Sequence, residues 1–416
     1  MLSESLSDRF RRQTIQPEEA QQLLLDHIRS LGSESIPLNE AWGRTLAEAL
    51  DAPHPYPPFR RSGMDGYALR AADLAEAAPD RPVTLAVLES LPSGVEPLHK
   101  IGPGQASRIM TGGMVPEDAD AVVMLEATKA ERPNEVQIGK PIAAGLNIAD
   151  IGCEIADGER LLSAGQRIGA GESALLAAFG HATVAVAAKP RVAILSTGSE
   201  LLEPHEPLVP AKIRNSNLPM LIALVREAGA EPIVLGKVPD DRDRASEIVR
   251  EALAQCDLLV STGGVSVGDY DVMVDVLAAS DVNLLFNKIA MRPGSPTTAA
   301  IVAGKPLVAL SGNPGACFVG FQLFALPAIK RMLGASTPYA ASFQAHLGVS
   351  FPKVNAYRRY IRGCTRIENG RVYVDPTGDD KSSLMKTIVG ADCLIEIPAT
   401  KTGIEAGELV TAWRLG

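Results

Sequence analysis

The sequence predicts an α/β protein of several domains, in which a central domain with a parallel sheet is accompanied by an inserted β-rich domain, an elongated helical segment and a C-terminal all-β domain. Three observations predict this class. The chain has 416 residues, which suits two to four domains at roughly 100–200 residues each. Residues 189–333 alternate apolar runs with helical patterns. Residues 81–148 and 334–416 contain short β-like runs separated by turn residues.

The pattern of apolar residues in the N-terminal part of the chain predicts two helices. Residues 17–31, PEEAQQLLLDHIRSL, place apolar side chains at helical spacing, with Pro17 suited to the first turn and Gly32 to the stop. We expect a second helix over residues 39–50. The proline-rich stretch APHPYPPF at 52–59 then predicts an irregular boundary loop.

The next part of the chain predicts an insertion. The runs PVTLAVL, ASRIMTG, DAVVML and EVQIG read as strands, and a helical pattern returns at ESALLAAFG. We therefore expect an elongated linking segment made of residues 1–51 and 149–188, a β-rich domain at 52–148 inserted into it, an α/β domain at 189–333, and a C-terminal β-barrel-like domain at 334–416.

The α/β domain carries the strongest pattern. RVAILS, PIVLG, DLLVS and PLVALS are near-continuous apolar runs, and helical segments such as NLPMLIALVREAGA and RASEIVREALAQ lie between them. Apolar runs without alternation are typical of parallel strands that are buried on both faces. We therefore expect a parallel sheet covered by helices on both sides.

Small and acidic residues follow the ends of these strands. The loops TGSE, PDD, STGGVSVGDYD and SGNPG supply Gly198, Glu200, Asp240, Asp241, Gly263, Gly264, Ser266, Gly268, Asp269, Ser311, Gly312 and Asn313. In an open α/β sheet, ligands bind in the crevice at the carboxyl ends of the strands. If the strands are neighbours, these groups share one rim.

The chemistry of that rim suggests a phosphorylated ligand with a metal ion. Glycine N–H groups at helix starts can hold phosphate oxygens, and carboxylates beside them are consistent with a bound Mg²⁺ ion. Glu200, Asp240 and Asp269 are the candidate ligands of the metal. A plain turn or a helix N-cap accounts for each loop taken singly. Four such loops in one sheet favour the functional interpretation.

Composition excludes other classes. The net charge of −9 argues against a nucleic-acid-binding protein. No apolar stretch reaches the length of a membrane span, and the N-terminus has no apolar core of a signal peptide, so we expect a cytoplasmic protein. Five dispersed cysteines and six dispersed histidines fit neither a disulfide framework nor a zinc site.

An ordered set of motifs resembles the molybdopterin molybdenumtransferase family, which contains the MoeA proteins and the gephyrin E domain. The motifs are PPFRRSGMDGYAL, RIMTGGMVPEDADAVV, ILSTGSEL, STGGVSVGDYD, KIAMRPGSP and LSGNPGA, and they extend over nearly the whole chain. Each motif alone is weak, because Asp65-Gly66 suits a plain turn and Lys288 and Arg292 suit a solvated surface. Their order and spacing are specific.

The resemblance implies a function in molybdenum cofactor synthesis. The family inserts molybdate into adenylated molybdopterin with magnesium and releases AMP. It acts as a homodimer whose cleft lies between the central domain of one subunit and elements of the other, and it receives its substrate from an adenylating partner enzyme. The linking segment would then also serve dimerisation.

The resemblance also implies roles for particular residues. Asp65 matches an aspartate near the metal oxyanion, and Thr111 matches a threonine at the cleft. Glu200, Asp240 and Asp269 match the acids of their loops, with Asp241 open as the alternative to Asp240. Lys288 and Arg292 match two lysines. In the C-terminal domain, Arg358 or Arg359 and Ser382 or Ser383 match less surely, and Ser383 is the preferred serine.

Several positions depart from the family pattern. Where the family has GENIRRxGED, this chain has GLNIADIGCEI at 145–155, so Ala149 replaces an arginine and Cys153 a glutamate. Arg292 keeps a charge but changes its geometry, and Ser295 replaces the lysine of GKP. Ser311 replaces a common proline. Fewer cations imply weaker anion binding, so the alternative is a catalytically weakened scaffold protein on the same fold. An adenylating or nucleotide-hydrolysing enzyme that shares only the central domain is a third alternative.

Overall fold

The chain divides into two compact units. The computed structural model describes residues 12–238, 242–265, 272–277, 279 and 281–415. One unit contains Met1–Glu48, Ala164–Ser173 and Ala182–Gly416, and the other contains Ala49–Ser163 and Ala174–His181. The second unit is therefore built from segments inserted into the first. The division into four domains stays a prediction.

The first unit contains a six-stranded mixed sheet. Its strands, in spatial order, are β16 (Glu231–Val238), β13 (Arg191–Thr197), β17 (Leu258–Thr262), β21 (Lys305–Leu310), β20 (Thr298–Val302) and β18 (Val282–Phe286). β16, β13, β17 and β21 pair in parallel. β20 runs antiparallel to both of its neighbours, so the expected wholly parallel sheet is wrong at this edge. The reason is a tight hairpin between β20 and β21, in which the chain reverses direction at Ala303 and Gly304. Their φ angles of 49° and 78° lie in the left-handed region that such turns use.

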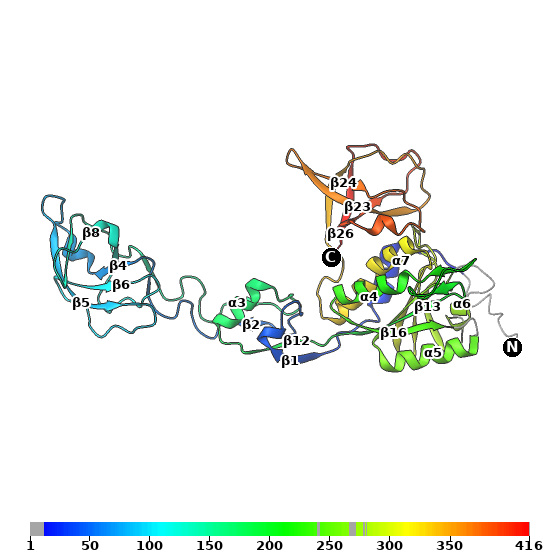
Figure 1. Cartoon of the computed structure of the whole chain (residues 1–416), viewed down its shortest axis with the longest axis horizontal. Helices are drawn as coiled ribbons and strands as arrows, with labels where there is room; N and C mark the ends of the chain where they lie inside the picture. The colour runs from blue at the N-terminus through cyan, green and yellow to red at the C-terminus, as the bar shows by residue number, and fades with distance from the viewer. Residues whose placement is uncertain (1–11, 239–241, 266–271, 278, 280, 416) are drawn as a thin grey trace. The chain divides into compact units, whose positions relative to one another are not determined.

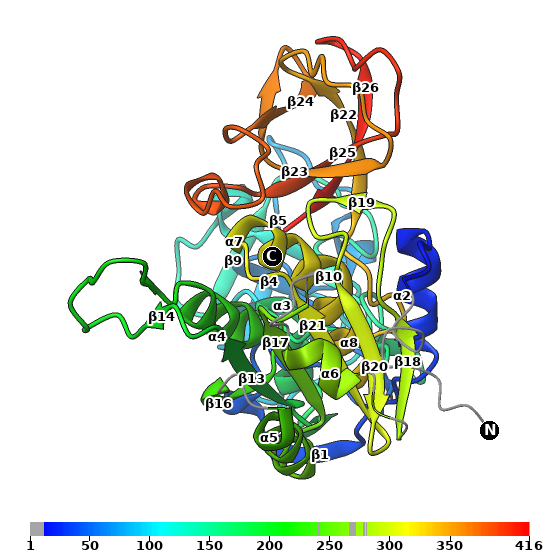
Figure 2. The same cartoon turned by 90° about the vertical axis from the view of Figure 1, so that its right-hand side faces the viewer.

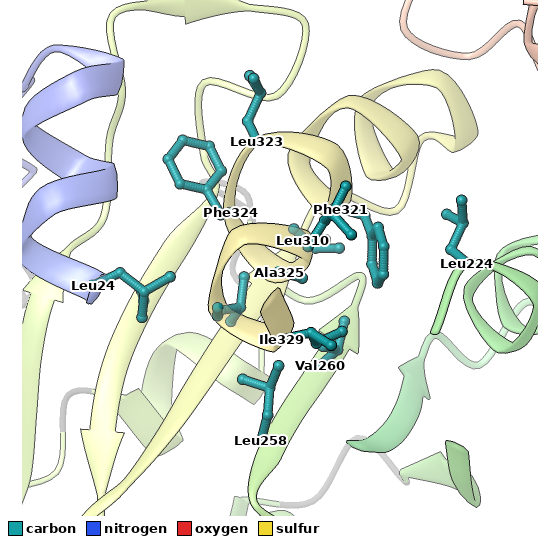
Figure 3. Packing of buried hydrophobic residues seen from close by; sticks show 14 of the residues in the cluster. Leu24, Leu224, Leu258, Val260, Leu310, Phe321, Leu323, Phe324, Ala325 and Ile329 are labelled. Atoms are coloured by element: carbon teal, nitrogen blue, oxygen red, sulfur yellow. The ribbon is translucent and has the colours of Figure 1, made fainter. Parts of the chain in front are cut away.

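Helices cover both faces of this sheet, as expected (Figures 1 and 2). The helical segments on one face are α4 (Asn217–Glu227), α7 (Pro314–Gly320), the π-helical turn η4 (Phe321–Ala325) and α8 (Leu326–Met332), and those on the other are α5 (Arg242–Gln255) and α6 (Val272–Leu277). Side chains of β13 alternate between the two cores, with Ile194 in the first and Leu195 in the second. Figure 3 shows Leu258, Val260 and Ile329 in the first core.

The N-terminal segment has less helix than its pattern predicts. Helix α2 (Pro17–Leu25) ends before residue 31, and the helical structure within residues 39–50 is limited to the end of the short turn η1 (Leu38–Glu40). The helix expected over 39–50 is wrong because its N–H groups bond to distant chain segments: Leu46 N donates to Gln166 O at 2.8 Å. Strand β1 (Ser33–Pro37) of this segment pairs with β12 (Thr183–Ala187). A further short pair, β14 (Leu201–Leu202) and β15 (Ile213–Arg214), follows β13 in the chain. Within the described residues, every helix is too short or too polar to span a bilayer.

A closed β-sheet follows in the same unit. Its elements are β19 (Met291–Arg292), β22 (Ser342–Leu347), β23 (Arg358–Glu368), β24 (Arg371–Pro376), η5 (Lys386–Ile388), β25 (Cys393–Ile397) and β26 (Leu409–Arg414). The order β23-β24-β22-β26-β25 closes because β25 pairs back onto β23. Buried Ile361, Val374 and Ile395 fill its interior. The expected barrel-like all-β part is present.

The second unit contains another six-stranded sheet, as the β-like runs predict. Its elements are β7 (Ala121–Met124), β4 (Gly66–Leu69), β6 (Gln105–Ile109), β5 (Val83–Leu91), β9 (Glu135–Ile138) and β8 (Thr128–Lys129) in spatial order, with η2 (Ala71–Leu74) and η3 (Leu125–Ala127). Short pairs join β2 (Leu50–Asp51) to β11 (Arg160–Leu162), and β3 (Arg61–Ser62) to β10 (Ile148–Ala149). Helix α3 (Ala170–Ala178) matches the expected ESALLAAFG helix.

The cysteines differ in burial, which predicts their reactivity. Cys153 is exposed, whereas Cys317 is buried, and burial raises the pKa of the Cys317 thiol to about 12. Because the thiolate is the nucleophile, we expect iodoacetamide at pH 8 to alkylate Cys153 and to leave Cys317 unmodified in the native protein. Peptide mass mapping measures this, and labelling in guanidinium is the control. Equal labelling of the two cysteines in the native protein would contradict the described packing.

Candidate functional site

Three strand-end loops meet at the carboxyl edge of the mixed sheet. Strands β13, β17 and β21 are neighbours in the sheet and end at Thr197, Thr262 and Leu310. The loops that follow them line one cavity of about 1440 Å³. The predicted residues that line it are Gly198, Glu200, Gly263, Gly264, Ser311, Gly312, Asn313, Arg292 and Ser383. Asp240, Asp241, Ser266, Gly268 and Asp269 lie outside the described residues.

The glycines of the middle loop are required by space as well as by backbone conformation. Gly263 and Gly264 have φ of 87° and 66°, in the left-handed region that favours glycine. A Cβ atom on Gly263 would lie 2.7 Å from the main-chain oxygen of Thr197, and one on Gly264 would lie 2.8 Å from Thr197 Oγ1. The loop after β17 is therefore packed directly against the end of β13.

A buried asparagine joins the loops to one another. Asn217 Nδ2 donates hydrogen bonds of 2.8 Å to Thr262 Oγ1 and to the main-chain oxygen of Gly312. Thr262 Oγ1 in turn donates to Ser311 O at 3.1 Å. Sequence reasoning missed Asn217, because an asparagine at the start of a helix is also an ordinary capping residue.

Two buried polar atoms of the cavity lining have no partner in the described part of the chain. They are Asn217 Oδ1 and Asn215 Nδ2, on side chains that are almost fully buried. Buried polar groups are normally hydrogen-bonded, because an unmade bond costs about 1–3 kcal/mol. A bound ligand that presents both a donor and an acceptor would satisfy them.

Glu200 is the one predicted metal ligand that the structure describes. It is exposed and lines the cavity, and a Cβ atom on Gly198 would lie 2.6 Å from its Oε2 atom. Among the described residues, no three His, Cys, Asp or Glu side chains form a metal-binding group. The proposed partners Asp240 and Asp269 lie outside those residues. A single carboxylate is compatible with Mg²⁺, which is commonly held by one or two carboxylates and substrate phosphates.

Cations form a second wall of the cavity. Arg292 of β19 lies beside Arg359 of β23 in the register of the two paired strands, and both line the cavity with Lys353. Arg358 does not line it and instead forms ion pairs with Glu18 and Glu396. Lys288 is half-buried and is also absent from the lining. Of the two cations predicted at 288 and 292, the structure therefore places only Arg292 in the cavity lining.

A buried arginine fixes the loop that carries the two serines. Ser382 O accepts hydrogen bonds from Gly315 N at 2.8 Å and Ala316 N at 3.2 Å, so the loop is held against the start of α7. Arg362 Nη2 donates to Lys381 O at 3.2 Å and to Thr387 Oγ1 at 2.8 Å. Burial lowers the pKa of Arg362. Ser382 and Ser383 both line the cavity.

Sequence reasoning missed part of this lining. The residues that it did not name include Leu208, Arg214, Asn215, Asn217, Lys353, Asp380 and Lys381. The DDKSS stretch at 379–383 carries three charged residues beside the two candidate serines and was the available signal.

In the second unit, the structure brings Asp65 and Thr111 together. Asp65 Oδ1 accepts hydrogen bonds of 2.7 Å from both the main-chain N–H and the hydroxyl of Thr111. These bonds and the charge of Arg108 hold the pKa of Asp65 below its usual value of 3.8. Both residues are exposed. The pair therefore presents an ionised carboxylate to solvent.

Two of the departures from the family pattern, Ala149 and Cys153, lie in the same unit as this pair. Ala149 pairs with Arg61 in the β10–β3 ladder, and Arg61 Nη2 lies 3.7 Å from Glu154 Oε2. Cys153 is exposed. These positions thus change the charge of a surface rather than the packing of a core.

The fold and the cavity together define a class of protein with a glycine-rich, cation-lined cavity at the carboxyl edge of a mixed α/β sheet. Family models agree. Residues 15–180 match the MoeA N-terminal region (domain I and II), residues 193–331 a probable molybdopterin binding domain, and residues 344–415 the MoeA C-terminal region (domain IV). The chain belongs to the MoeA family of molybdopterin molybdenumtransferases.

Individual relatives match over nearly the whole chain. The molybdopterin molybdenumtransferase of Bacillus subtilis (strain 168) is 42% identical over 388 residues, which cover 92% of this chain and 90% of that protein. The Staphylococcus aureus (strain MSSA476) enzyme of the same name is 38% identical, with 96% and 95% covered. The crystal structure of the molybdopterin biosynthesis moeA protein from Pyrococcus horikoshii OT3 is 32% identical, has a TM-score of 0.83, and covers 97% of this chain and 100% of that one.

Proposed function

We propose that the protein inserts molybdate into adenylated molybdopterin and releases AMP, as a step of molybdenum cofactor biosynthesis. The observation that carries the proposal is the composition of the cavity. Glycines of three strand-end loops, several arginines and Glu200 line the same cavity. A phosphate-bearing nucleotide and an oxyanion both need such surroundings.

The described residues have separable roles in this proposal. The loops at Gly198, Gly263 and Gly312 hold the pterin nucleotide through main-chain groups, and the free amide atoms of Asn215 and Asn217 orient it. Arg292 and Arg359 neutralise molybdate or phosphate charge, assisted by the hydroxyl groups of Ser382 and Ser383. Lys288 is proposed to neutralise anion charge as well, and the effect of Lys288→Gln on turnover tests this role.

Magnesium would be held by Glu200 with Asp240 and Asp269. When bound, the ion would neutralise the phosphate charge of the nucleotide. The carboxylate of Glu200 itself lines the cavity, where it can orient water.

We further propose that the protein acts as a homodimer in the cytoplasm and receives its substrate from an adenylating enzyme. In this proposal, Asp65 and Thr111 of one subunit act near the oxyanion in the cleft of the other. The support is the resemblance to the family together with the direct Asp65–Thr111 contact, which keeps the carboxylate ionised.

The test is a turnover assay with purified protein, adenylated molybdopterin, molybdate and Mg²⁺. We expect release of AMP and a product that activates an apo-molybdoenzyme. Glu200→Gln should lower the rate by about 10- to 100-fold because it removes a charge at the cavity edge. Glu227→Gln, at an exposed site at the end of α4, is the matched control and should retain the wild-type rate.

Two results would count against the proposal. Absence of AMP release at saturating substrate would favour the scaffold alternative, which the loss of cations at Ser295 and Ala149 already suggests. AMP release without molybdate and without formation of cofactor would favour a nucleotide-hydrolysing enzyme.

A further inference from the structure

An acidic residue sits inside the cationic wall of the cavity. Asp380 lines the cavity, and its carboxylate forms ion pairs with Arg359 Nη1 through Oδ2 and with Lys353 Nζ through Oδ1. Only 7% of the Asp380 side chain is exposed. Each of its oxygens is therefore engaged by one of two cations of this wall, Arg359 and Lys353.

The neighbouring Asp379 differs in each of these respects. Its side chain is 42% exposed and it does not line the cavity. Its contacts are longer, at 3.6 Å to Lys353 and 3.4 Å to Lys381. Adjacent residues of the same charge thus occupy a buried and a solvated position, which provides a matched pair for experiment.

The contacts of Asp380 occupy donor groups of Arg359 and Lys353 that a ligand could otherwise use. Arg359 Nε donates to Asn355 Oδ1 and Nη1 donates to Asp380, so Nη2 is the nitrogen of this guanidinium without a described partner. Arg292, its neighbour across the β19–β23 pairing, is exposed and has no ion pair among the described residues. Of the three cations of this wall, Arg292 is therefore available to a ligand, whereas Arg359 and Lys353 are already paired with an internal carboxylate. Arg214 and Lys381 also line the cavity.

We propose that Asp380 acts as an internal competitor that sets the affinity of the cavity for an oxyanion, because molybdate must share Arg359 and Lys353 with its carboxylate. This inference rests on the proposed function of the cavity. The alternative is that Asp380 only orients Arg359 toward the ligand. The two roles predict opposite signs, since removal of a competitor strengthens anion binding and removal of a positioning group weakens it.

Electrostatics gives the size of the expected change. Removing one negative charge a few Å from the bound anion, in a partly solvated cavity, corresponds to about a 10-fold gain in affinity. The same substitution at exposed Asp379 should change affinity by less than about 2-fold, because solvent screens its contacts.

The experiment measures binding of sodium molybdate alone to the full-length protein by isothermal titration calorimetry at low ionic strength. Asp380→Asn and Asp380→Ser are compared with wild type and with Asp379→Asn, and the melting temperature of each variant confirms that it is folded. We expect both neutral variants at 380 to bind molybdate about 10-fold more tightly. Adding Arg359→Gln to Asp380→Asn should remove that gain.

The other possible outcomes would contradict the proposal in different ways. Unchanged or weaker binding by both variants at 380, while wild type binds molybdate, would overturn the competitor role and leave the proposed function intact. An equal gain for Asp379→Asn would also overturn it, because the effect would then be one of general charge. If no variant binds molybdate, the inference fails together with the oxyanion role of this wall, and the turnover assay then decides the function separately.

Discussion

Asp65→Asn is expected to lower the rate of cofactor formation by about 100-fold or more and to leave the melting temperature almost unchanged. The carboxylate is exposed, so its loss removes no buried contact. Asparagine Oδ1 can still accept the hydrogen bonds that Thr111 N–H and Oγ1 donate at 2.7 Å. The substitution therefore removes charge while it retains geometry, and electrostatic groups of this kind commonly contribute about 100-fold or more to rate. The turnover assay and differential scanning fluorimetry measure the two quantities.

The contribution of Asp65 to stability depends on pH in a direction that follows from its pKa. Hydrogen bonds from Thr111 lower the pKa of Asp65, so the stability that they contribute is fully present above the unfolded pKa and is lost as pH falls through the folded pKa. Asp65 should accordingly stay ionised, and should not itself cause a change in rate, between pH 5 and 8. Asp118→Asn, at an exposed position in the same unit, is the control. A large loss of stability in Asp65→Asn with full activity would show that Asp65 only supports a turn.

Gly66→Ala is expected to destabilise the second unit by about 3 kcal/mol or more. A Cβ atom on Gly66 would lie 1.9 Å from the main-chain oxygen of Val123 in the paired strand β7. Neither backbone can yield without breaking the ladder of β4, so the strand pairing must open. Urea unfolding of the full chain, followed by circular dichroism, measures the change.

Gly63→Ala supplies the matched control for this glycine. It lies three residues earlier, and its Cβ atom would meet only Asn147 O, at 3.4 Å. We expect little change in the unfolding midpoint for Gly63→Ala. Equal stability of the two variants would show that β4 and β7 are not paired as described.

The expected effects of Asp65→Asn and Gly66→Ala assign different roles to the two residues of the Asp65-Gly66 dipeptide. Asp65-Gly66 resembles a standard turn dipeptide, and by sequence alone both residues could be turn formers. In the structure, Gly66 begins strand β4 and lacks a side chain because a neighbouring strand occupies that space. Asp65 is instead held by a residue that is far away in the sequence, Thr111.

Local patterns were sufficient for most of the elements. Near-continuous apolar runs indicated the buried strands β13 and β17, and alternating helical patterns indicated α4 and α5, because both follow from burial periodicity within a few residues. The same reasoning missed the antiparallel hairpin of β20 and β21. Ala303-Gly304 was the available turn signal, and its importance depended on which strands pair.

The sequence by itself determined the class of fold, the glycine and acidic character of the strand-end loops and the family motifs, because these depend on residue type and local spacing. Only the tertiary structure decided that Arg359 rather than Arg358 faces the cavity, that Asn217 ties the end of β17 to the loop after β21, and that Asp380 pairs with two cations of the cavity wall. The physical reason is that successive residues of a strand point to opposite sides, and which side meets a ligand depends on segments that are distant in the chain.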